Sequence, residues 1–207
     1  MISERTAQGR ASLITLATFG LAIVLGCKGE ESARPTEKPA AEVKPLRVRM
    51  ETNYGTMVIE LEREKAPITV DNFLAYVDDK FFDGTIIHRI AKVGIHVLQG
   101  GGFEEGMRHK PTRPPIRNES NNGLKNVRGT ISMARTRDLH SATSQFFINV
   151  ADNPALDYPS QGGYCVFGKV IEGLDVVDKI GNAIPNNQTM YDGPPNETIR
   201  IISATRM

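Results

Sequence analysis

From residue 46 to the C-terminus, short β-prone runs alternate with turn-forming residues, and this rhythm is the feature that most limits the possible folds. Eight runs are rich in β-branched and aromatic residues and are separated by Gly, Asn, Asp and Pro. They occupy residues 47–52, 55–61, 84–90, 96–101, 129–134, 145–150, 164–170 and 198–207. This pattern predicts a mainly β domain.

Two further segments follow a helical period instead. Residues 67–79 place four apolar side chains at i, i+3, i+4 and i+7, and Pro67 suits a first helical turn. Residues 172–182 place three apolar side chains on one stripe and reach a stop signal at Gly181. Eight strands and two helices predict a closed eight-stranded antiparallel β-barrel capped by two α-helices.

The N-terminal segment differs from this domain. Arg5 and Arg10 precede an apolar run over residues 11–26, which matches the charged and apolar regions of a secretory signal. The run has 16 residues, whereas a membrane-spanning helix needs about 20. A small residue before Cys27 resembles a bacterial lipobox, although Val24 stands where leucine is more common. We therefore predict a lipoprotein signal peptide over residues 1–26 and lipidation of Cys27; a cleaved signal or an uncleaved anchor are the alternatives.

The next segment has the composition of a spacer. Residues 28–45 are rich in Glu, Lys, Pro and Ala and have almost no large apolar residue, which is typical of a disordered linker. We expect residues 27–45 to tether a folded domain over residues 46–207 to a membrane through the lipid. The domain would then lie in a bacterial cell envelope, facing the periplasm or the cell exterior.

Composition excludes several classes of site. A hydrophobic content of 40% over 207 residues supports one core, and a net charge of +1 gives no attraction to nucleic acid. Cys27 and Cys165 lie far apart, and the four histidines lack metal-ligand spacing, so we expect no metal site and no disulfide framework. We expect Cys165 to be a small buried thiol. We expect a monomer.

Residues 145–150 carry the first hint of a site. The two-residue period of a strand puts three apolar residues on one face, which is a core face, and Gln145, Phe147 and Asn149 on the other. Two amides beside an aromatic ring suit a shallow site that grips an apolar group and a peptide backbone. The alternative is that Gln145 faces water beside a half-buried Phe147.

Three glycines at residues 100–102 could suggest a phosphate site. The segment lacks the Lys-Ser/Thr pair of a P-loop and does not open a helix, so phosphate binding is not expected. A turn or a close approach of two backbones explains the glycines better.

Five segments, in order and at similar spacing, resemble the cyclophilin family of peptidyl-prolyl cis-trans isomerases. They read FFDGTIIHRI, LQGGGF, NESNNGLKNVRGTISMAR, SATSQFFINV and GGYCVFGKVIEGLDVVDKI. The resemblance covers nearly all of residues 46–207 and is strongest to bacterial members. It implies an eight-stranded barrel closed by two helices, proline-containing polypeptides as substrates, and a reaction that needs no cofactor, metal or covalent intermediate.

The resemblance also implies roles for individual residues. Arg89 stands at the position of the catalytic arginine, and Phe147 at that of the aromatic residue on which the proline ring packs. Gln99 and Gln145 match amides that hold the substrate backbone and the arginine. Val97 and Leu156 match apolar neighbours of the proline pocket, and Tyr164 matches a further pocket position. Ala134 and Arg135 match a strand edge that pairs with the peptide through main-chain groups, so the side chain of residue 135 matters less.

One stretch departs from the family pattern. The chain has two residues more than usual between Arg89 and Gln99 and lacks the Phe-Met pair of the proline pocket. We expect His96 and Val97 to replace that pair, which would give a smaller and more polar wall and weaker proline binding. Ala155 stands where many members have Trp or Phe, which predicts poor affinity for the family inhibitor cyclosporin.

Three functions compete at this point. The first is an active, lipid-anchored isomerase that assists the folding of envelope or secreted polypeptides. The second is a weakly active or inactive peptide-binding module or chaperone. The third is a barrel lipoprotein that carries a small apolar ligand in its lumen, for which a barrel filled by large apolar side chains leaves little room.

Overall fold

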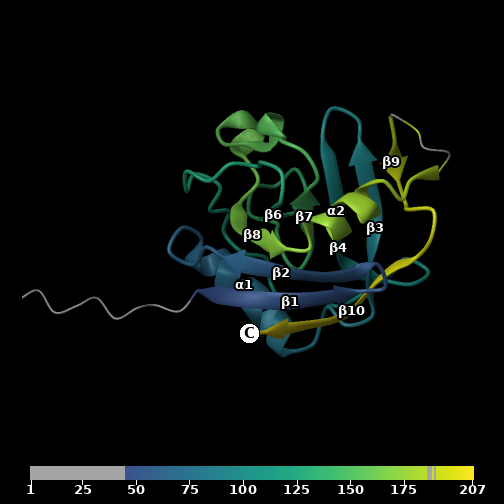
Figure 1. Cartoon of the computed structure of the whole chain (residues 1–207). Helices are drawn as coiled ribbons and strands as arrows, with labels where there is room; N and C mark the ends of the chain where they lie inside the picture. Colours follow the sequence, from purple (N-terminus) through teal and green to yellow (C-terminus); the bar gives the residue numbers. More distant parts are fainter. Residues whose placement is uncertain (1–44, 186–187, 189) are drawn as a thin grey trace, which may run out of the picture. The chain divides into compact units, whose positions relative to one another are not determined.

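The computed structural model describes residues 45–185, 188 and 190–207. The predicted signal peptide, the predicted lipidation of Cys27 and nearly all of the predicted linker lie outside these residues. The domain over residues 46–207 contains the ten strands and the two α-helices that the described part of the chain forms (Figure 1).

Eight of the strands close into a barrel. All strand pairs are antiparallel, and the order β4-β7-β6-β8-β2-β1-β10-β3 returns to its start because β3 also pairs with β4. These eight strands are β1 (Leu46–Thr52), β2 (Gly55–Leu61), β3 (Thr85–Lys92), β4 (His96–Glu104), β6 (Thr130–Met133), β7 (Phe146–Asn149), β8 (Val166–Glu172) and β10 (Ile199–Arg206). The predicted closed barrel is confirmed, and each of the eight runs forms one strand.

Two further strands extend the sheet at its rim. β5 (Arg108–His109) pairs with β4, and β9 (Asp192–Gly193) pairs with β3 beyond the point where β10 leaves it. Each has only two residues, which is too short for any periodic signal in the sequence.

The helix α1 (Pro67–Asp78) forms as predicted but lacks a local cap. Pro67 occupies the first turn, where a missing N–H costs nothing, and Ala66 at the N-cap position makes no side-chain hydrogen bond. Instead, the Glu119 carboxylate accepts hydrogen bonds from the backbone N–H groups of Ile68 and Thr69, at 3.2 and 2.9 Å. The N-terminus of α1 is thus capped by a residue about 50 positions away in the sequence.

The second helix, α2 (Leu174–Gly181), also lies where the apolar stripe predicts it. It follows Gly173, which has a φ of +85°. A Cβ at this position would also clash with the carbonyl oxygen of Thr56, so both the backbone angle and the close packing require glycine. None of the described helices is long and apolar enough to cross a membrane.

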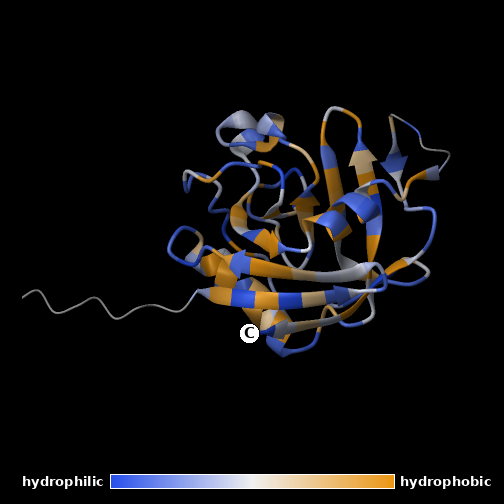
Figure 2. Cartoon of the chain, in the orientation of Figure 1, coloured by the Kyte–Doolittle hydropathy of each residue, from blue (hydrophilic) through white to orange (hydrophobic). Residues whose placement is uncertain are grey.

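The barrel interior is filled by side chains. Phe73 of α1 packs against Phe82, Phe146 and Phe167 with ring centroids 5.1 to 6.0 Å apart, and apolar residues line the strands (Figure 2). Cys165 is buried beside this core, as predicted. This packing argues against a ligand-carrying lumen.

The glycines at 100–102 are explained by close packing. Gly101 has a φ of +81°, and a Cβ there would lie 2.8 Å from the ring of Phe146. A Cβ on Gly102 would lie 2.5 Å from Cγ of Gln145. A Cβ on Gly100 would lie 3.0 Å from the backbone carbonyl oxygen of Ile86, so the predicted close approach of two backbones is confirmed at that residue.

Candidate active site

A small apolar cluster lies apart from the barrel core, on its outer face. Val97 and Phe147 are 2% and 4% exposed, although strand alternation turns both away from the barrel interior. With neighbouring side chains they line a cavity of about 160 Å³. The lining residues are Arg89, Ile95, Val97, Gln99, Ala134, Arg135, Phe147, Leu156 and Tyr164.

The walls come from separate parts of the chain. The β3–β4 hairpin contributes four of the lining residues. Leu156 of the short 3₁₀ helix η1 (Pro154–Leu156) and Tyr164, which follows the 3₁₀ helix η2 (Ser160–Gly162), also line the cavity. Tyr164 packs its ring edge-on against Phe147, with centroids 5.7 Å apart. Phe147 therefore forms a rigid apolar floor that its neighbours hold in place.

A chain of hydrogen bonds follows the polar side of the pocket. The Arg89 guanidinium donates from Nε and Nη2 to the two carboxylate oxygens of Asp192, at 2.6 and 2.7 Å, and from Nη1 to Oε1 of Gln99, at 3.0 Å. Nε2 of Gln99 donates in turn to Oε1 of Gln145, at 2.9 Å. The chain runs across β9, β3 and β4 to the residue before β7 and fixes a cation at the pocket edge.

The ion pair keeps both groups charged. Hydrogen bonding to Asp192 raises the pKa of Arg89, and hydrogen bonding to Arg89 lowers the pKa of Asp192 below its usual value. The Arg89 side chain is 36% exposed, so the guanidinium is partly withdrawn from water yet open to a ligand. A permanent, oriented cation is thereby available to the pocket.

Arg135 contributes its side chain as well as its backbone. Its guanidinium stacks over the Tyr164 ring at 4.3 Å and donates to the carbonyl oxygens of Gln161, at 2.7 Å, and Gly163, at 3.0 Å. The Arg135 side chain therefore links the η2 segment and the Tyr164 ring beside the pocket, whereas the expected pairing of its main chain with a peptide stays a prediction.

A second, more polar hollow adjoins the pocket. It has a volume of about 340 Å³ and shares Gln99, Ala134 and Arg135 with the apolar cavity. Its remaining lining side chains are those of His109, Thr136, Ser141, Thr143 and Gln145. An extended peptide could place an apolar ring in the first cavity and polar groups along the second.

The prediction that His96 lines the pocket is wrong. Its side chain points to the other face of β4, where Nε2 lies 3.1 Å from the carbonyl oxygen of Gly181 at the end of α2. Ile95 occupies the pocket wall beside Val97 instead, which makes this wall apolar rather than polar. The signal was present in the sequence, because counting back by twos from Gln99 gives Val97 and then Ile95.

Asn149 also differs from the expectation that it shares a shallow site with Phe147. It is fully buried, and its Nδ2 donates to Oγ1 of Thr130, at 2.9 Å, while its Oδ1 accepts from Nδ2 of Asn153, at 2.7 Å. Asn153 binds the backbone of His96 in turn. Asn149 therefore holds the β3–β4 hairpin in place from beneath rather than facing a ligand.

Like Ile95, Asp192 was not among the residues predicted from the sequence, although it is bonded to Arg89 at the pocket edge. It lies 103 residues from Arg89, in a two-residue strand with no motif around it. Within the described residues, no group of three or more His, Cys, Asp or Glu side chains could hold a metal ion.

Comparisons with known proteins identify the relatives of this chain. Residues 47–206 match the family described as "Cyclophilin type peptidyl-prolyl cis-trans isomerase/CLD". A peptidyl-prolyl cis-trans isomerase of Acinetobacter baylyi is 52% identical over 157 residues, which are 75% of this chain and 82% of that protein. The peptidyl-prolyl cis-trans isomerase B of Escherichia coli is 49% identical over 162 residues, which are 76% of this chain and 98% of that protein.

The solved structures that match this chain have the same fold. A crystal structure of a cyclophilin type peptidyl-prolyl cis-trans isomerase of Cryptosporidium parvum has a TM-score of 0.64 and 28% identity, and the match covers 79% of this chain and 98% of that one. A second crystal structure of that protein, determined in the presence of the dipeptide Ala-Pro, has a TM-score of 0.63 and covers 78% of this chain and 98% of that one.

Proposed function

Because the chain belongs to the cyclophilin type peptidyl-prolyl cis-trans isomerase family and is an enzyme of that class, we propose that the pocket between Arg89 and Phe147 is where it accelerates rotation about X-Pro bonds. The observation that carries this proposal is the Arg89 guanidinium, held by two neighbours at the edge of an apolar cavity whose floor is Phe147. A proline ring fits the apolar floor, and its amide nitrogen then faces the cation.

The chemistry follows from the X-Pro bond itself. Delocalisation of the nitrogen lone pair gives a rotation barrier of about 18–20 kcal/mol, and uncatalysed isomerisation takes about 10–100 s. In the twisted transition state the lone pair is localised, so the nitrogen becomes a hydrogen-bond acceptor. A fixed cationic donor therefore stabilises the transition state more than the planar ground state, which is the requirement for catalysis.

The contribution of Arg89 has an upper bound. A charge-assisted hydrogen bond stabilises by about 1.5–3 kcal/mol, which corresponds to about ten- to a hundredfold in rate. The rest of the acceleration comes from orientation and from removal of water. Phe147 and Leu156 would exclude water from the ring, and Gln145 and the main chain of Ala134 and Arg135 would hold the peptide in an extended form.

Ile95 and Val97 line the pocket of this chain, which lacks the Phe-Met pair typical of the family, and we expect this difference to affect peptide binding more than the chemical step. These side chains leave a less complete apolar enclosure, so we expect a high KM for short peptides and a kcat set by Arg89. Ala155 is exposed on η1 next to Leu156, which supports the predicted weak affinity for cyclosporin.

The test is the cis-to-trans isomerisation rate of a short X-Pro peptide with the purified full-length chain in a mild detergent. We expect Arg89→Ala to lower kcat/KM at least about tenfold. Arg63→Ala is a matched control, since Arg63 is also paired with an aspartate, Asp71, but lies outside the pocket. Equal rates for the wild-type chain and Arg89→Ala, both above the uncatalysed rate, would refute the assignment of this pocket. A wild-type rate no faster than the uncatalysed reaction would favour a peptide-binding module with little turnover.

We propose further that Cys27 carries a lipid that anchors the enzyme in a bacterial cell envelope, where it assists the folding of envelope or secreted polypeptides. The support is the order of features in the sequence: basic residues, an apolar run of 16 residues, a small residue, Cys27 and a polar spacer. Several acyl chains on one residue suffice for stable anchoring, because each buried CH₂ contributes about 0.8 kcal/mol. Metabolic labelling with a fatty acid tests this: label that persists in Cys27→Ala would refute the anchor.

A further inference from the structure

We propose that Asp192 is a positioning residue for catalysis: its carboxylate locks the Arg89 guanidinium in the orientation that the reaction needs. This inference rests on the catalytic role proposed for Arg89, and it assigns to β9 a function that the barrel itself does not require.

A guanidinium has five N–H donors in a fixed plane. Asp192 takes two of them side-on, through Nε and Nη2, and Gln99 takes one from Nη1. Within the described residues these three bonds hold the group from two directions and leave two N–H donors for a ligand. With Gln99 alone, the guanidinium could rotate about that single bond, and its free donors would not point at a fixed place.

The bidentate geometry is not by itself evidence of function. Arg206 and Asp78 form a similar pair on the surface, and Arg128 donates to both oxygens of Asp178. Such exposed pairs contribute little to stability. Arg89 differs because its third nitrogen reaches Gln99, which lines the cavity and continues the hydrogen-bond chain to Gln145.

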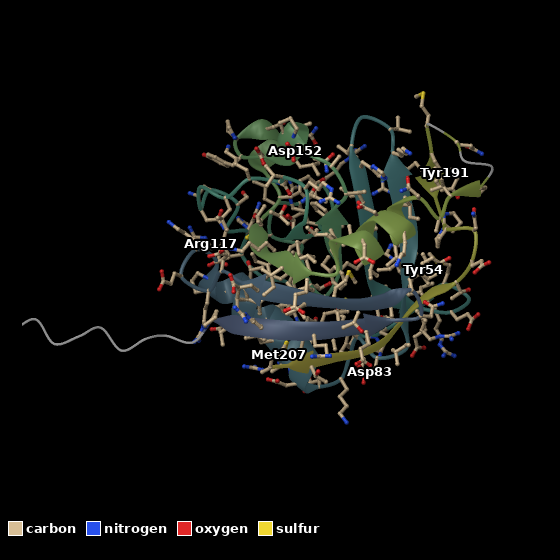
Figure 3. All side chains as sticks on the ribbon, in the orientation of Figure 1. Tyr54, Asp83, Arg117, Asp152, Tyr191 and Met207 are labelled. Carbon is tan, nitrogen blue, oxygen red and sulfur yellow. The ribbon has the colours of Figure 1, made fainter. Side chains whose placement is uncertain are left out.

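The backbone around Asp192 holds the carboxylate in register with Arg89. Asp192 pairs with Ala91 and Gly193 with Ile90, so β9 is fixed along the edge of β3 next to the catalytic arginine. The backbone N–H of Lys92 donates to the carbonyl oxygen of Tyr191, and the Tyr191 side chain packs against the hydrophobic core. Figure 3 shows Tyr191 beside β9 at the rim of the barrel.

Removal of the carboxylate has a predictable kinetic signature. The Arg89 side chain would regain rotamer freedom, and the cost of immobilising it again in the transition state corresponds to a loss of about three- to tenfold in kcat. The apolar floor remains, so we expect KM to change by less than about twofold. A carboxylate that acted mainly by weakening the positive charge of Arg89 would have the opposite effect, because its removal would raise kcat.

The experiment measures kcat and KM of the full-length chain for an X-Pro peptide in Asp192→Ala, Asp192→Asn and Asp192→Glu. We expect kcat to fall in the first two and to recover in part in Asp192→Glu, which restores a carboxylate. Asp71→Ala is the matched control, since it breaks the exposed pair with Arg63 away from the site and leaves kcat unchanged. Asp192→Asn is nearly isosteric and keeps the test valid if the alanine variant folds poorly.

A double-mutant cycle separates this inference from the proposal on which it rests. In an Arg89→Ala background, Asp192→Ala has nothing to position, so we expect no further loss of kcat. If Arg89→Ala is slow while Asp192→Ala matches or exceeds the wild-type rate, the inference about Asp192 fails and the role of Arg89 stands. Additive losses would likewise overturn positioning through Arg89. Wild-type activity in Arg89→Ala would overturn the proposed function itself.

Discussion

Replacement of Glu119 by alanine is expected to destabilise the domain strongly, although Glu119 lies in a loop far from α1 in the sequence. The first N–H groups of any helix lack intrahelical partners, and Ala66 at the N-cap position supplies none. The Glu119 carboxylate accepts from the backbone N–H groups of Ile68 and Thr69 and from the Thr69 hydroxyl, at 3.2, 2.9 and 2.8 Å. This one side chain therefore performs the function of the missing cap.

The magnitude follows from what each lost contact leaves behind. Ile68 is 43% exposed, so its N–H can turn to water, whereas Thr69 is only 1% exposed and its N–H would stay buried without an acceptor. The Thr69 hydroxyl keeps the Sγ of Cys165 as a partner, at 3.4 Å. Loss of a cap costs about 0.5–2 kcal/mol, and a buried unsatisfied donor costs about 1–3 kcal/mol. Since these terms overlap, we expect Glu119→Ala to lower the free energy of unfolding by about 2–3 kcal/mol.

The assay is thermal and urea unfolding of the purified chain. For a domain of this size, 1 kcal/mol shifts Tm by about 2–4 °C, so Glu119→Ala lowers Tm by about 4–12 °C. Glu119→Gln keeps an acceptor oxygen but loses the charge at the helix N-terminus, and we expect about 1 kcal/mol. Glu64→Ala, at an exposed carboxylate two residues before Ala66, is the control. A Glu119→Ala variant within about 0.5 kcal/mol of wild type, or no more affected than Glu64→Ala, would refute the reasoning.

Three further predictions concern the site and its support. Gly102→Ala places a Cβ 2.5 Å from Gln145 and displaces that side chain, so we expect a folded chain with kcat/KM lowered by about tenfold, and an unchanged rate in the peptide assay would contradict this. Burial and the charge of Arg89 lower the pKa of His88 to about 4, so the folded state disfavours protonation of this residue. The free energy of unfolding is therefore highest with respect to His88 above pH 6.5 and decreases as the pH falls toward 4. Because His88 is partly exposed, the decline amounts to at most about 3 kcal/mol, and urea unfolding across this range would show it in wild type and not in His88→Phe. Asn149→Ala removes the acceptor of the Asn153 Nδ2 hydrogen bond and the donor to Oγ1 of Thr130 in a buried network, and is expected to cost about 2–3 kcal/mol; a loss below about 0.5 kcal/mol in the same unfolding assay would show that water replaces the network.

The sequence predicted the architecture because strands and helices have local signals. The eight β-prone runs and the two apolar stripes each became one element, and Pro67 lies in the first turn of α1, where its backbone chemistry places it. Gly181 is the last helical residue of α2 and has no positive φ, so it does not act as a left-handed C-terminal stop. The two-residue strands β5 and β9 were not predicted, since a periodic pattern needs more residues than they have.

Some parts of the pocket were also accessible from the sequence. The split of residues 145–150 by a period of two placed Gln145 and Phe147 on one face, and the resemblance to a family added Arg89 and Gln99. These four residues lie together in the structure, linked by hydrogen bonds or by the shared cavity wall. The assignment of His96 failed because the family position was transferred across an insertion without applying the same period of two.

What the sequence by itself determined is therefore the barrel, its apolar core and the residue types of a proline pocket, since each depends on neighbours along one element. Only the tertiary structure decided that Ile95 faces the pocket, that Glu119 caps α1, and that Asp192 holds Arg89. The last two contacts join residues 50 and 103 positions apart through loops and rim strands that carry no periodic signal. Their partners are fixed by how the barrel closes, and barrel closure is a property of the whole domain rather than of any one segment.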